Sequence, residues 1–323
     1  MKKLAMKIVA AVVLMIVALP QQVQAARLLV PGGQVIGMAL EDGSVSVAGF
    51  DEKLGAAAKS AGLQVGDQIL ELNDKPIHCP EDIREALSKS DGTVTLTLRR
   101  GQSQKKIKFC PAATKQGPKL GVYLKKGITG IGTVTWYDPE NGQFGALGHG
   151  VNTTAGKLLK LEKGSVYDVQ VLGVKKGCIG DPGQLMGSVT GAAVVGDIRE
   201  NAPQGVFGKI EKTGQLEAMP AAEVSQIHTG SAKILSTVDG TTTREYSVEI
   251  LKIYPNASRT DRNMLIKITD PALLEATGGI VQGMSGSPII QDGRLIGAVT
   301  HVLVSDPTTG YGIFIENMLD AAA

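Results

Sequence analysis

Apolar and polar residues alternate over short stretches along most of the chain, a pattern typical of half-buried strands. Residues 93–98 read Thr-Val-Thr-Leu-Thr-Leu. Two segments depart from this alternation: residues 54–61 are rich in alanine and stop at Gly62, and a second helical pattern begins at Pro80. Glycine commonly ends a helix and proline commonly begins one. The pattern predicts a small α+β unit over residues 27–113.

A polar stretch bounded by proline and glycine, residues 111–118, follows this unit and predicts a domain boundary. Short strand patterns with turn signals between them then recur to the end of the chain. We expect strands at 133–137, 143–147, 233–238, 244–254, 264–268, 288–290 and 295–304, and sparse helices at 220–226 and 271–276. The fold class is therefore predicted to be mainly β, with a β-barrel or paired barrels over residues 114–323.

Residues 1–25 have the organisation of an export signal. Lysines precede residues 8–19, which are uncharged and apolar, and Val23-x-Ala25 places small residues before an expected cleavage point at Ala26. The apolar run is shorter than the roughly 20 residues that span a bilayer, which favours a cleaved signal peptide. An uncleaved N-terminal membrane anchor is the alternative. Either reading predicts that the rest of the chain is exported.

Composition narrows the possible function classes. Of the 323 residues, 43% are hydrophobic, which excludes a wholly disordered chain. Only 4% are aromatic and 41 residues are glycine, a composition that suits strands joined by tight turns. The formal net charge is +2, and leaving out Lys2, Lys3 and Lys7 makes it −1. This nearly neutral body argues against a nucleic-acid binder. The three cysteines form no C-x-x-C motif, and Cys79 and Cys110 either pair or stay unlinked.

The first unit resembles a PDZ domain of the bacterial, protease-associated type. The most specific part of the match is residues 61–69, Ala-Gly-Leu-Gln-Val-Gly-Asp-Gln-Ile. By this resemblance, the glycine-rich segment 31–38 would form the loop whose amides bind a peptide carboxylate, and the peptide would add a strand to the sheet edge. The alternative is that these glycines are turn residues only. The residues expected to contact the peptide are Ile36, Gly37, Met38, Ile83 and Leu87.

Two glycine-rich segments carry candidate nucleophile chemistry. His149 lies between glycines just after an expected hairpin, and Ser285 lies in a tight turn at residues 283–288. A serine hydroxyl is a weak nucleophile, so it needs a base such as His149. The amides of Gly283 and Ser285 can converge on one point, as an oxyanion hole requires. From the residues alone, a turn serine and a structural histidine remain the alternative.

Longer strings around these residues resemble the SpoIVB sporulation serine peptidase family. They are Phe-Gly-Ala-Leu-Gly-His-Gly at 144–150, Ile-Thr-Asp-Pro at 268–271, Thr-Gly-Gly-Ile-Val-Gln at 277–282 and Gly-Ala-Val-Thr-His-Val at 297–302. The layout agrees too, with an N-terminal membrane signal, one PDZ domain and then a peptidase. The resemblance implies a chymotrypsin-like double β-barrel with a Ser/His/Asp site and no cofactor.

The resemblance also implies a role for each site residue. Ser285 would attack the scissile carbonyl, and His149 would take its proton and return it to the leaving amine. The family's acid falls on Asp270, which stands only 15 residues before Ser285. Asp197 is the positional rival, because most chymotrypsin-like enzymes carry the acid much farther ahead of the serine. We favour Asp270 because its surrounding string matches the family; for either aspartate, a turn or cap residue is the alternative.

The remaining candidates carry weaker signals. His301 lies on an expected strand after the serine turn, and either lines the substrate pocket or is structural. His78 and His228 are expected at the surface, and four scattered histidines without an H-E-x-x-H motif argue against a metal site. Met284 stands where trypsin-type zymogens carry an aspartate that receives a new N-terminus. Control is therefore expected from the PDZ domain or from self-cleavage near the N-terminus.

The sequence thus predicts an exported or membrane-tethered serine endopeptidase of sporulation signalling, acting in the space between two cell membranes. By the resemblance, its substrate is a membrane-bound regulator of an intramembrane metalloprotease, and cutting it lets a late sigma factor be processed. A peptide ligand of the PDZ domain is a second expected partner. The alternative is a PDZ scaffold with an inactive peptidase-like barrel. A third possibility is an HtrA-like quality-control protease, but those usually place the PDZ domain after the peptidase.

Overall fold

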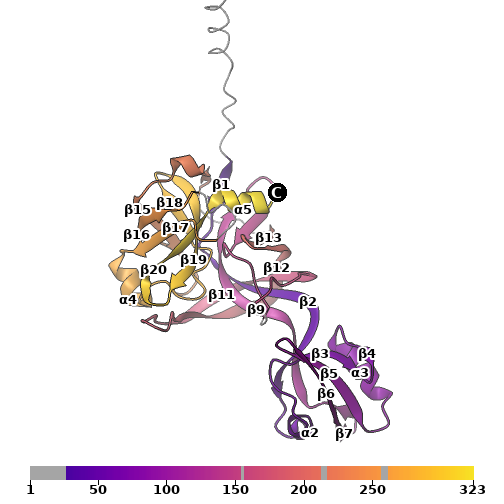
Figure 1. Cartoon of the computed structure of the whole chain (residues 1–323). Helices are drawn as coiled ribbons and strands as arrows, with labels where there is room; N and C mark the ends of the chain where they lie inside the picture. The colour runs from indigo at the N-terminus through magenta and orange to yellow at the C-terminus, as the bar shows by residue number, and fades with distance from the viewer. Residues whose placement is uncertain (1–26, 154–155, 212–216, 256–260) are drawn as a thin grey trace, which may run out of the picture.

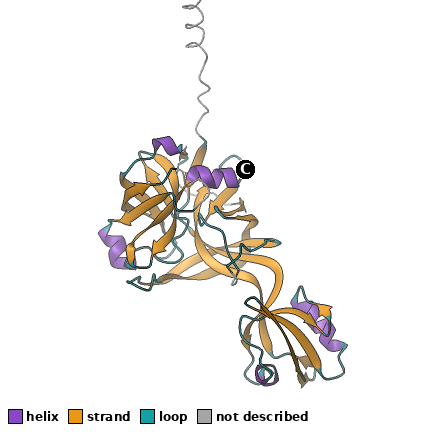
Figure 2. Cartoon of the chain, in the orientation of Figure 1, coloured by secondary structure: helices purple, strands orange, loops and turns teal. Residues whose placement is uncertain are grey.

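The computed structural model describes residues 27–153, 156–211, 217–255 and 261–323. Strands dominate the molecule, and they form two barrels with a smaller lobe projecting from them (Figure 1, Figure 2). The predicted export signal at 1–25 lies outside the described residues. Among the residues that are described, no helix is both long and apolar enough to cross a bilayer.

The small lobe packs a short, strongly curved sheet against two helices. Its core side chains include Ile83 and Leu87 of the second helix, together with Leu96 and Leu98 of the sheet, all nearly inaccessible to solvent. The chain leaves the first helix through Gly62, where φ is +92°. The elements of this lobe are β3 (Gln68–Leu72), β4 (Lys75–Pro76), β5 (Val94–Arg100), β6 (Ser103–Phe109), β7 (Ala112–Thr114), β8 (Gly117–Lys119), α2 (Ala56–Ser60) and α3 (Pro80–Ser88).

The first barrel closes because one strand pairs, on its two edges, with two strands that lie far from each other in the sheet order. The strands, in order around the barrel, are β2 (Val35–Phe50), β9 (Val122–Tyr137), β10 (Gln143–Ala146), β13 (Gly205–Ile210), β12 (Gln184–Ala202) and β11 (Lys163–Lys175). β2 pairs antiparallel with β11 on one side and with β9 on the other, which completes the ring. β1 (Leu28–Pro31) and β14 (Met219–Pro220) extend the sheet beyond β9. Val134, Phe144 and Val166 are fully buried inside.

The second barrel is also a closed antiparallel ring. Its strands, in ring order, are β15 (Gly230–Ser236), β16 (Arg244–Ile253), β17 (Met264–Ile268), β20 (Asp306–Phe314), β19 (Arg294–Leu303) and β18 (Pro288–Gln291). Three short helices cover its ends: η1 (Val224–Gln226), α4 (Pro271–Thr277) and α5 (Ile315–Ala321). The core contains Ile234, Val248, Ile266 and Val299. The predictions of a mainly β fold and of a double β-barrel are confirmed.

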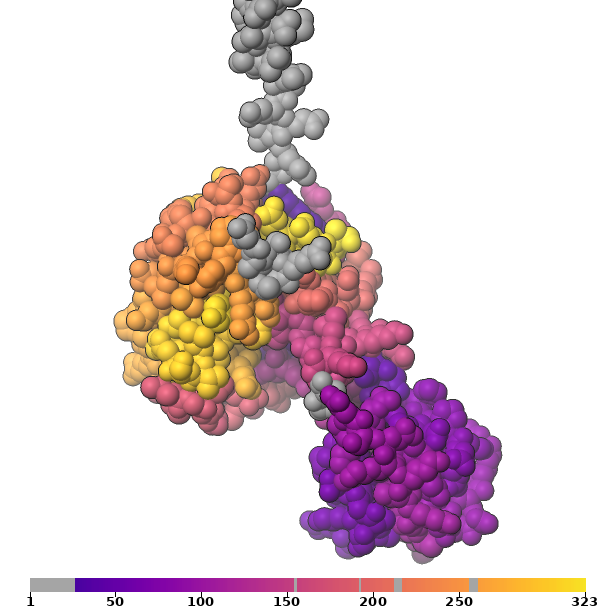
Figure 3. Space-filling model, in the orientation of Figure 1, coloured from indigo at the N-terminus to yellow at the C-terminus, as the bar shows by residue number. Residues whose placement is uncertain are grey.

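The predicted boundary of the small unit, residues 27–113, is wrong at both ends. β2 and β9 pair along most of their length, and both run from the first barrel into the small lobe (Figure 1). Residues 36–41 pair with β11 and so belong to the barrel, while residues 122–126 pair with the part of β2 that lies in the lobe. Strand patterning predicts a strand but not its partner, so the sequence alone did not reveal which residues belong to the barrel and which to the lobe. The lobe is thus inserted into the β2–β9 hairpin of the barrel. It projects from the barrels as a separate body (Figure 3).

All three cysteines are free in the structure, so Cys79 and Cys110 form no disulfide. The predicted helix at 271–276 and the predicted strand at 143–147 occur as α4 and β10, each within one residue of the expected bounds. The predicted strand at 133–137 is the last part of β9, which begins eleven residues earlier, at Val122. At 220–226, only the short 3-10 turn η1 forms.

Candidate active site

His149 stands on a sharp turn directly after β10. Leu147 and Gly148 have φ angles of +69° and +70°, in the left-handed region that a leucine rarely occupies. A Cβ atom on Gly148 would lie 2.9 Å from Cγ2 of Thr300, so this turn of the first barrel is pressed against the second. Such local strain persists only where the surrounding structure enforces it, and it commonly occurs at functional sites.

The turn that carries Ser285 is held by β9. The hydroxyl of Thr133 donates to the carbonyl of Gly283 at 2.8 Å, and the hydroxyl of Thr135 donates to the carbonyl of Gly286 at 2.8 Å. Gly286 has a φ of +97°, and a Cβ atom there would lie 2.0 Å from the carbonyl oxygen of Thr133. Only glycine can therefore occupy this position without moving the strand that supports the nucleophile turn.

His149 and Ser285 line the same cleft, which has a volume of about 420 Å³ and lies between the barrels. The Ser285 hydroxyl donates to the carbonyl of Thr300 at 2.7 Å, and Nδ1 of His149 lies 3.1 Å from the carbonyl oxygen of Gly150. The structure thus brings the predicted nucleophile and base together. Catalysis requires the hydroxyl to turn from Thr300 towards the imidazole.

The two predicted oxyanion donors, the amides of Gly283 and Ser285, donate no hydrogen bond to any group in the described part of the chain. The neighbouring amides are occupied: that of Met284 donates to Val281 at 3.1 Å and that of Gly286 donates to Val299 at 2.7 Å. The side chain of Met284 is fully buried in the second barrel. Both predicted donors therefore remain available to a substrate carbonyl oxygen.

Asp270 occupies the N-cap position of α4. Its carboxylate accepts hydrogen bonds from the amides of Ala272 at 3.0 Å, Leu273 at 3.1 Å and Ser247 at 3.3 Å. Those contacts satisfy free amides at the helix start, a common role for aspartate. The carboxylate makes no contact with His149, so the structure provides a capping role and no geometric support for its assignment as the triad acid.

The rival carboxylate, Asp197, also points elsewhere. It is half exposed and accepts a hydrogen bond from Nε of Arg199 at 2.6 Å. Across the described ranges, no carboxylate forms an ion pair with His149. The structure therefore places the base and the nucleophile in one cleft but brings neither predicted acid to them.

Asn201, a buried residue near the end of β12, supports the histidine turn and was missed by the sequence reasoning. Its side-chain oxygen accepts from the amide of Val151 at 2.8 Å, and its amide group donates to the carbonyls of Val151 and Leu159. These bonds fix the chain just after His149. Nothing in the local sequence distinguishes Asn201 from a turn asparagine, because its role depends on a segment about 50 residues away.

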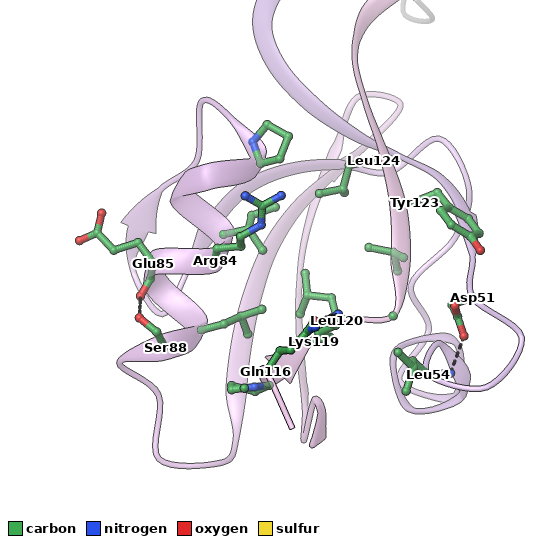
Figure 4. Close-up of a pocket in the computed structure, with 17 residues that line it drawn as sticks. Asp51, Leu54, Arg84, Glu85, Ser88, Gln116, Lys119, Leu120, Tyr123 and Leu124 are labelled. Carbon is green, nitrogen blue, oxygen red and sulfur yellow. Dashed lines mark hydrogen bonds between the residues drawn. The ribbon is translucent and has the colours of Figure 1, made fainter. Parts of the chain in front are cut away.

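The predicted peptide-binding residues separate into two places. Ile36, Gly37 and Met38 pair with β11 in the first barrel, and Met38 lines the catalytic cleft, so their assignment to a carboxylate-binding loop of the small lobe is wrong. Ile83 and Leu87 do line a groove of the small lobe, with a volume of about 1020 Å³, between α3 and the start of β9 (Figure 4).

The groove of the small lobe is open to an added strand. In the described chain, residues 122–124 of β9 pair with β2 on one edge and with no strand on the other. Leu120 and Gly121 lead into this edge, and neither of their amides donates a hydrogen bond within the described residues. Free backbone amides at the head of an unpaired edge suit the carboxylate of an extended peptide. In the described chain, the free amides of this lobe groove thus lie at residues 120–121, and residues 31–38 do not line it.

The profiles of two known families match the chain. The sequence profile of the SpoIVB peptidase S55 family matches residues 116–319, and the profile of a PDZ domain matches residues 53–100. The chain belongs to the SpoIVB peptidase S55 family. The suspected family and the predicted PDZ domain are confirmed.

Some curated relatives carry a different name. The S55 peptidase is 26% identical over 204 residues to a putative zinc metalloprotease of Rhizobium meliloti, covering 62% of this chain and 50% of that protein. It is 30% identical over 90 residues to a putative zinc metalloprotease of Agrobacterium fabrum, covering 28% of this chain and 23% of that protein. The chain thus spans half or less of these relatives. The described residues hold no group of three or more His, Cys, Asp or Glu placed to bind a metal ion.

Solved protease structures are distantly similar. The active form of the Rv3671c protease of M. tuberculosis is 15% identical, with a TM-score of 0.36, covering 60% of this chain and 72% of that one. The HtrA-type protease AlgW with a tripeptide is 16% identical, with a TM-score of 0.36, covering 59% of this chain and 54% of that one.

Proposed function

We propose that the chain is a serine endopeptidase that acts in sporulation signalling, on a membrane-anchored regulator of an intramembrane metalloprotease, so that a late sigma factor is processed. The observation that carries the proposal is that His149 and Ser285 share one cleft in a chain of the SpoIVB family. An extracytoplasmic location belongs to the same proposal. It is supported by the pattern of residues 1–25, which is that of an export signal or membrane anchor.

In the proposed reaction, Oγ of Ser285 turns from Thr300 to His149 and attacks the scissile carbonyl carbon. The serine proton passes to His149 as the new C–O bond forms, and the amides of Gly283 and Ser285 bind the resulting oxyanion. His149 then gives the proton to the leaving amine as the C–N bond breaks, which leaves an acyl-enzyme. A water molecule, deprotonated by His149, releases the acid product and restores the serine.

The PDZ groove is proposed to hold an extended peptide, either from the substrate or from a regulator. β9 supports this proposal, because residues 122–124 line the PDZ groove while Ile128 and Ile131, farther along, line the catalytic cleft. Beyond them, Thr133 bonds the nucleophile turn. A peptide added to the first part of this strand would therefore act on the strand that supports Ser285.

The test uses the full chain, purified in detergent, beside Ser285→Ala. Ser287→Ala is the matched control, because Ser287 lies in the same turn, is fully buried and bonds Ser236. We expect a fluorophosphonate to label the wild type and Ser287→Ala but not Ser285→Ala. We expect the same pattern for cleavage of the membrane regulator in lipid vesicles and for self-cleavage near the N-terminus.

Each outcome separates one part of the proposal from another. Labelling without cleavage of the regulator would contradict the proposed substrate and leave the peptidase intact. Absence of labelling and of cleavage in the wild type and in Ser285→Ala alike would favour the PDZ scaffold. Loss of labelling in Ser287→Ala with an unchanged melting temperature would mean that the wrong serine has been assigned.

A further inference from the structure

The imidazole of His149 has no carboxylate partner in the described chain. The proposed reaction nevertheless needs this ring to keep one orientation, and it needs the imidazolium that forms on it to be stabilised. Its Nδ1 lies 3.1 Å from the carbonyl oxygen of the next residue, Gly150. In a serine triad a carboxylate usually holds this nitrogen, fixes the tautomer and stabilises the imidazolium. Asp270 and Asp197 are engaged elsewhere. Another group must therefore perform these tasks.

A second imidazole, that of His301, packs directly against His149. The two ring centroids lie 5.1 Å apart, and the ring planes are inclined by 44°. His301 follows Thr300 on β19, and the carbonyl of Thr300 is the acceptor of the Ser285 hydroxyl. His301 also lines the catalytic cleft. It is thus a neighbour of both the base and the nucleophile.

A carboxylate stands behind His301. Oδ2 of Asp261 lies 3.4 Å from Nδ1 of His301, and this nitrogen is buried and makes no regular hydrogen bond. The hydroxyl of Thr300 donates to the carbonyl of Asp261 at 2.6 Å, which fixes the aspartate backbone beside β19. Within the described residues this nitrogen has no hydrogen-bond partner, and the Asp261 carboxylate is the acidic group that lies beside it.

We propose that His301 and Asp261 form a positioning pair for His149, in which the carboxylate orients His301 and His301 in turn packs the catalytic imidazole into place. The pair orients the base by ring packing, whereas a triad acid does so through a direct hydrogen bond. This inference rests on the proposed function, because it assigns a task only if His149 and Ser285 carry the reaction.

Charges around His301 determine how the pair responds to pH. Burial lowers the pKa of His301 and is the largest influence, Asp261 opposes that shift, and His149 and Arg262 add to it. Arg262 lies against the ring of Tyr311 with its Nε 3.9 Å from Asp261, so it neutralises part of that charge. His301 is therefore neutral at neutral pH. As pH falls through its lowered pKa, His301 becomes a cation beside His149 and disfavours the imidazolium that catalysis needs.

The experiment measures the rate at which a fluorophosphonate labels Ser285 in the full chain, resolved into a maximal rate and an apparent affinity, between pH 4.5 and 9. The variants are His301→Gln and Asp261→Asn. His228→Gln is the matched control, because His228 also contacts an aspartate, Asp292, at 2.8 Å but lies on the surface. Ser285→Ala sets the background.

We expect His301→Gln and Asp261→Asn to lower the maximal labelling rate about 10- to 100-fold, with little change in apparent affinity, because a misplaced imidazole costs rate rather than binding. Wild type should lose rate more steeply on the acid side than His301→Gln, because only the wild type carries the imidazole of His301, whose cation disfavours an imidazolium at His149. His228→Gln should match the wild type in the maximal labelling rate and in the loss of rate on the acid side.

Background labelling in Ser285→Ala equal to that of the wild type would overturn the proposed function and this inference together. If Ser285→Ala is inert while His301→Gln and Asp261→Asn keep the wild-type rate and acid slope, this inference alone is overturned. Asp261→Asn keeps the backbone carbonyl that Thr300 bonds. If His301→Gln fails to fold, Asp261→Asn therefore decides the result.

Discussion

Replacing Asp270 with asparagine distinguishes a helix cap from a triad acid. Asparagine keeps a side-chain oxygen for the amides of Ala272 and Leu273, but its NH₂ group faces the amide of Ser247 and loses that bond. Losing one hydrogen bond and the charge at the start of α4 costs about 1 kcal/mol in the free energy of unfolding. Asp270→Ala loses all three bonds and costs about 1–2 kcal/mol.

The corresponding melting temperatures follow from the size of the peptidase. About 1 kcal/mol lowers the melting temperature by about 2–4 °C in a domain of roughly 200 residues, so Asp270→Asn should melt slightly below the wild type and Asp270→Ala lower still. Since the carboxylate touches no cleft residue, kcat/KM of folded Asp270→Asn should stay within about threefold of the wild type, whereas loss of a triad acid costs about 10⁴-fold in kcat.

The assay combines thermal melting with the rate of fluorophosphonate labelling. Asp197→Asn serves as the control carboxylate, and it should leave both quantities unchanged because the Asp197 carboxylate is half exposed and its ion pair, with Arg199, lies at the surface. A loss of about 10⁴-fold in Asp270→Asn at a nearly wild-type melting temperature would refute the capping account. It would show that α4 moves its N-terminus to His149 during catalysis.

Three further variants test other parts of the architecture. Thr133→Val removes the hydroxyl bond to Gly283, worth about 1 kcal/mol, and should slow labelling of the serine about fivefold, which stopped-flow labelling can measure; an unchanged rate would show that the bond does not hold the oxyanion amides. Gly286→Ala places a Cβ atom 2.0 Å from a backbone oxygen, so labelling should be lost; a fully active variant would mean that the turn is not as tight as described. Asp67→Asn removes a buried carboxylate that accepts two bonds of 2.6 Å from Arg100, whose own side chain is 27% exposed, and should lower the melting temperature of the PDZ lobe while the barrels keep labelling, as two separate melting transitions would show; a single unshifted transition would contradict this.

Local patterns predicted the parts of the fold that depend on neighbouring residues. The alternation at 93–98 and the proline at residue 80 produced β5 and α3 where they were expected, because strand and helix signals act over a few residues. Residues 36–38 read equally well as part of either domain, since their strand pattern is the same in both. Their true partner, β11, lies more than 120 residues away in sequence, and no local signal identifies it.

The active site also has parts that local sequence patterns predict and parts that they do not. His149 and Ser285 were found because each sits in a glycine-rich turn with its own local signature, and the structure brings both to one cleft. Asp270 stands in an equally distinctive string, but an aspartate before a proline is also the signature of a helix N-cap, and that is what it forms. Asp261 carries no such string. Its proximity to His301 arises only when β17 and β19 are brought together through β20.

Insertion of the PDZ lobe into the β2–β9 hairpin has a consequence for limited proteolysis and for the dissection of this enzyme. A single cut in any lobe loop leaves two fragments that remain paired along the β2–β9 ladder, so the lobe is not shed by one nick. A peptidase fragment that starts after the lobe would lack β1 and β2, and its first barrel would be open at β9 and β11. Removal of the lobe therefore requires two cuts, or a deletion that rejoins β2 to β9 with a short turn at the point where both strands leave the barrel.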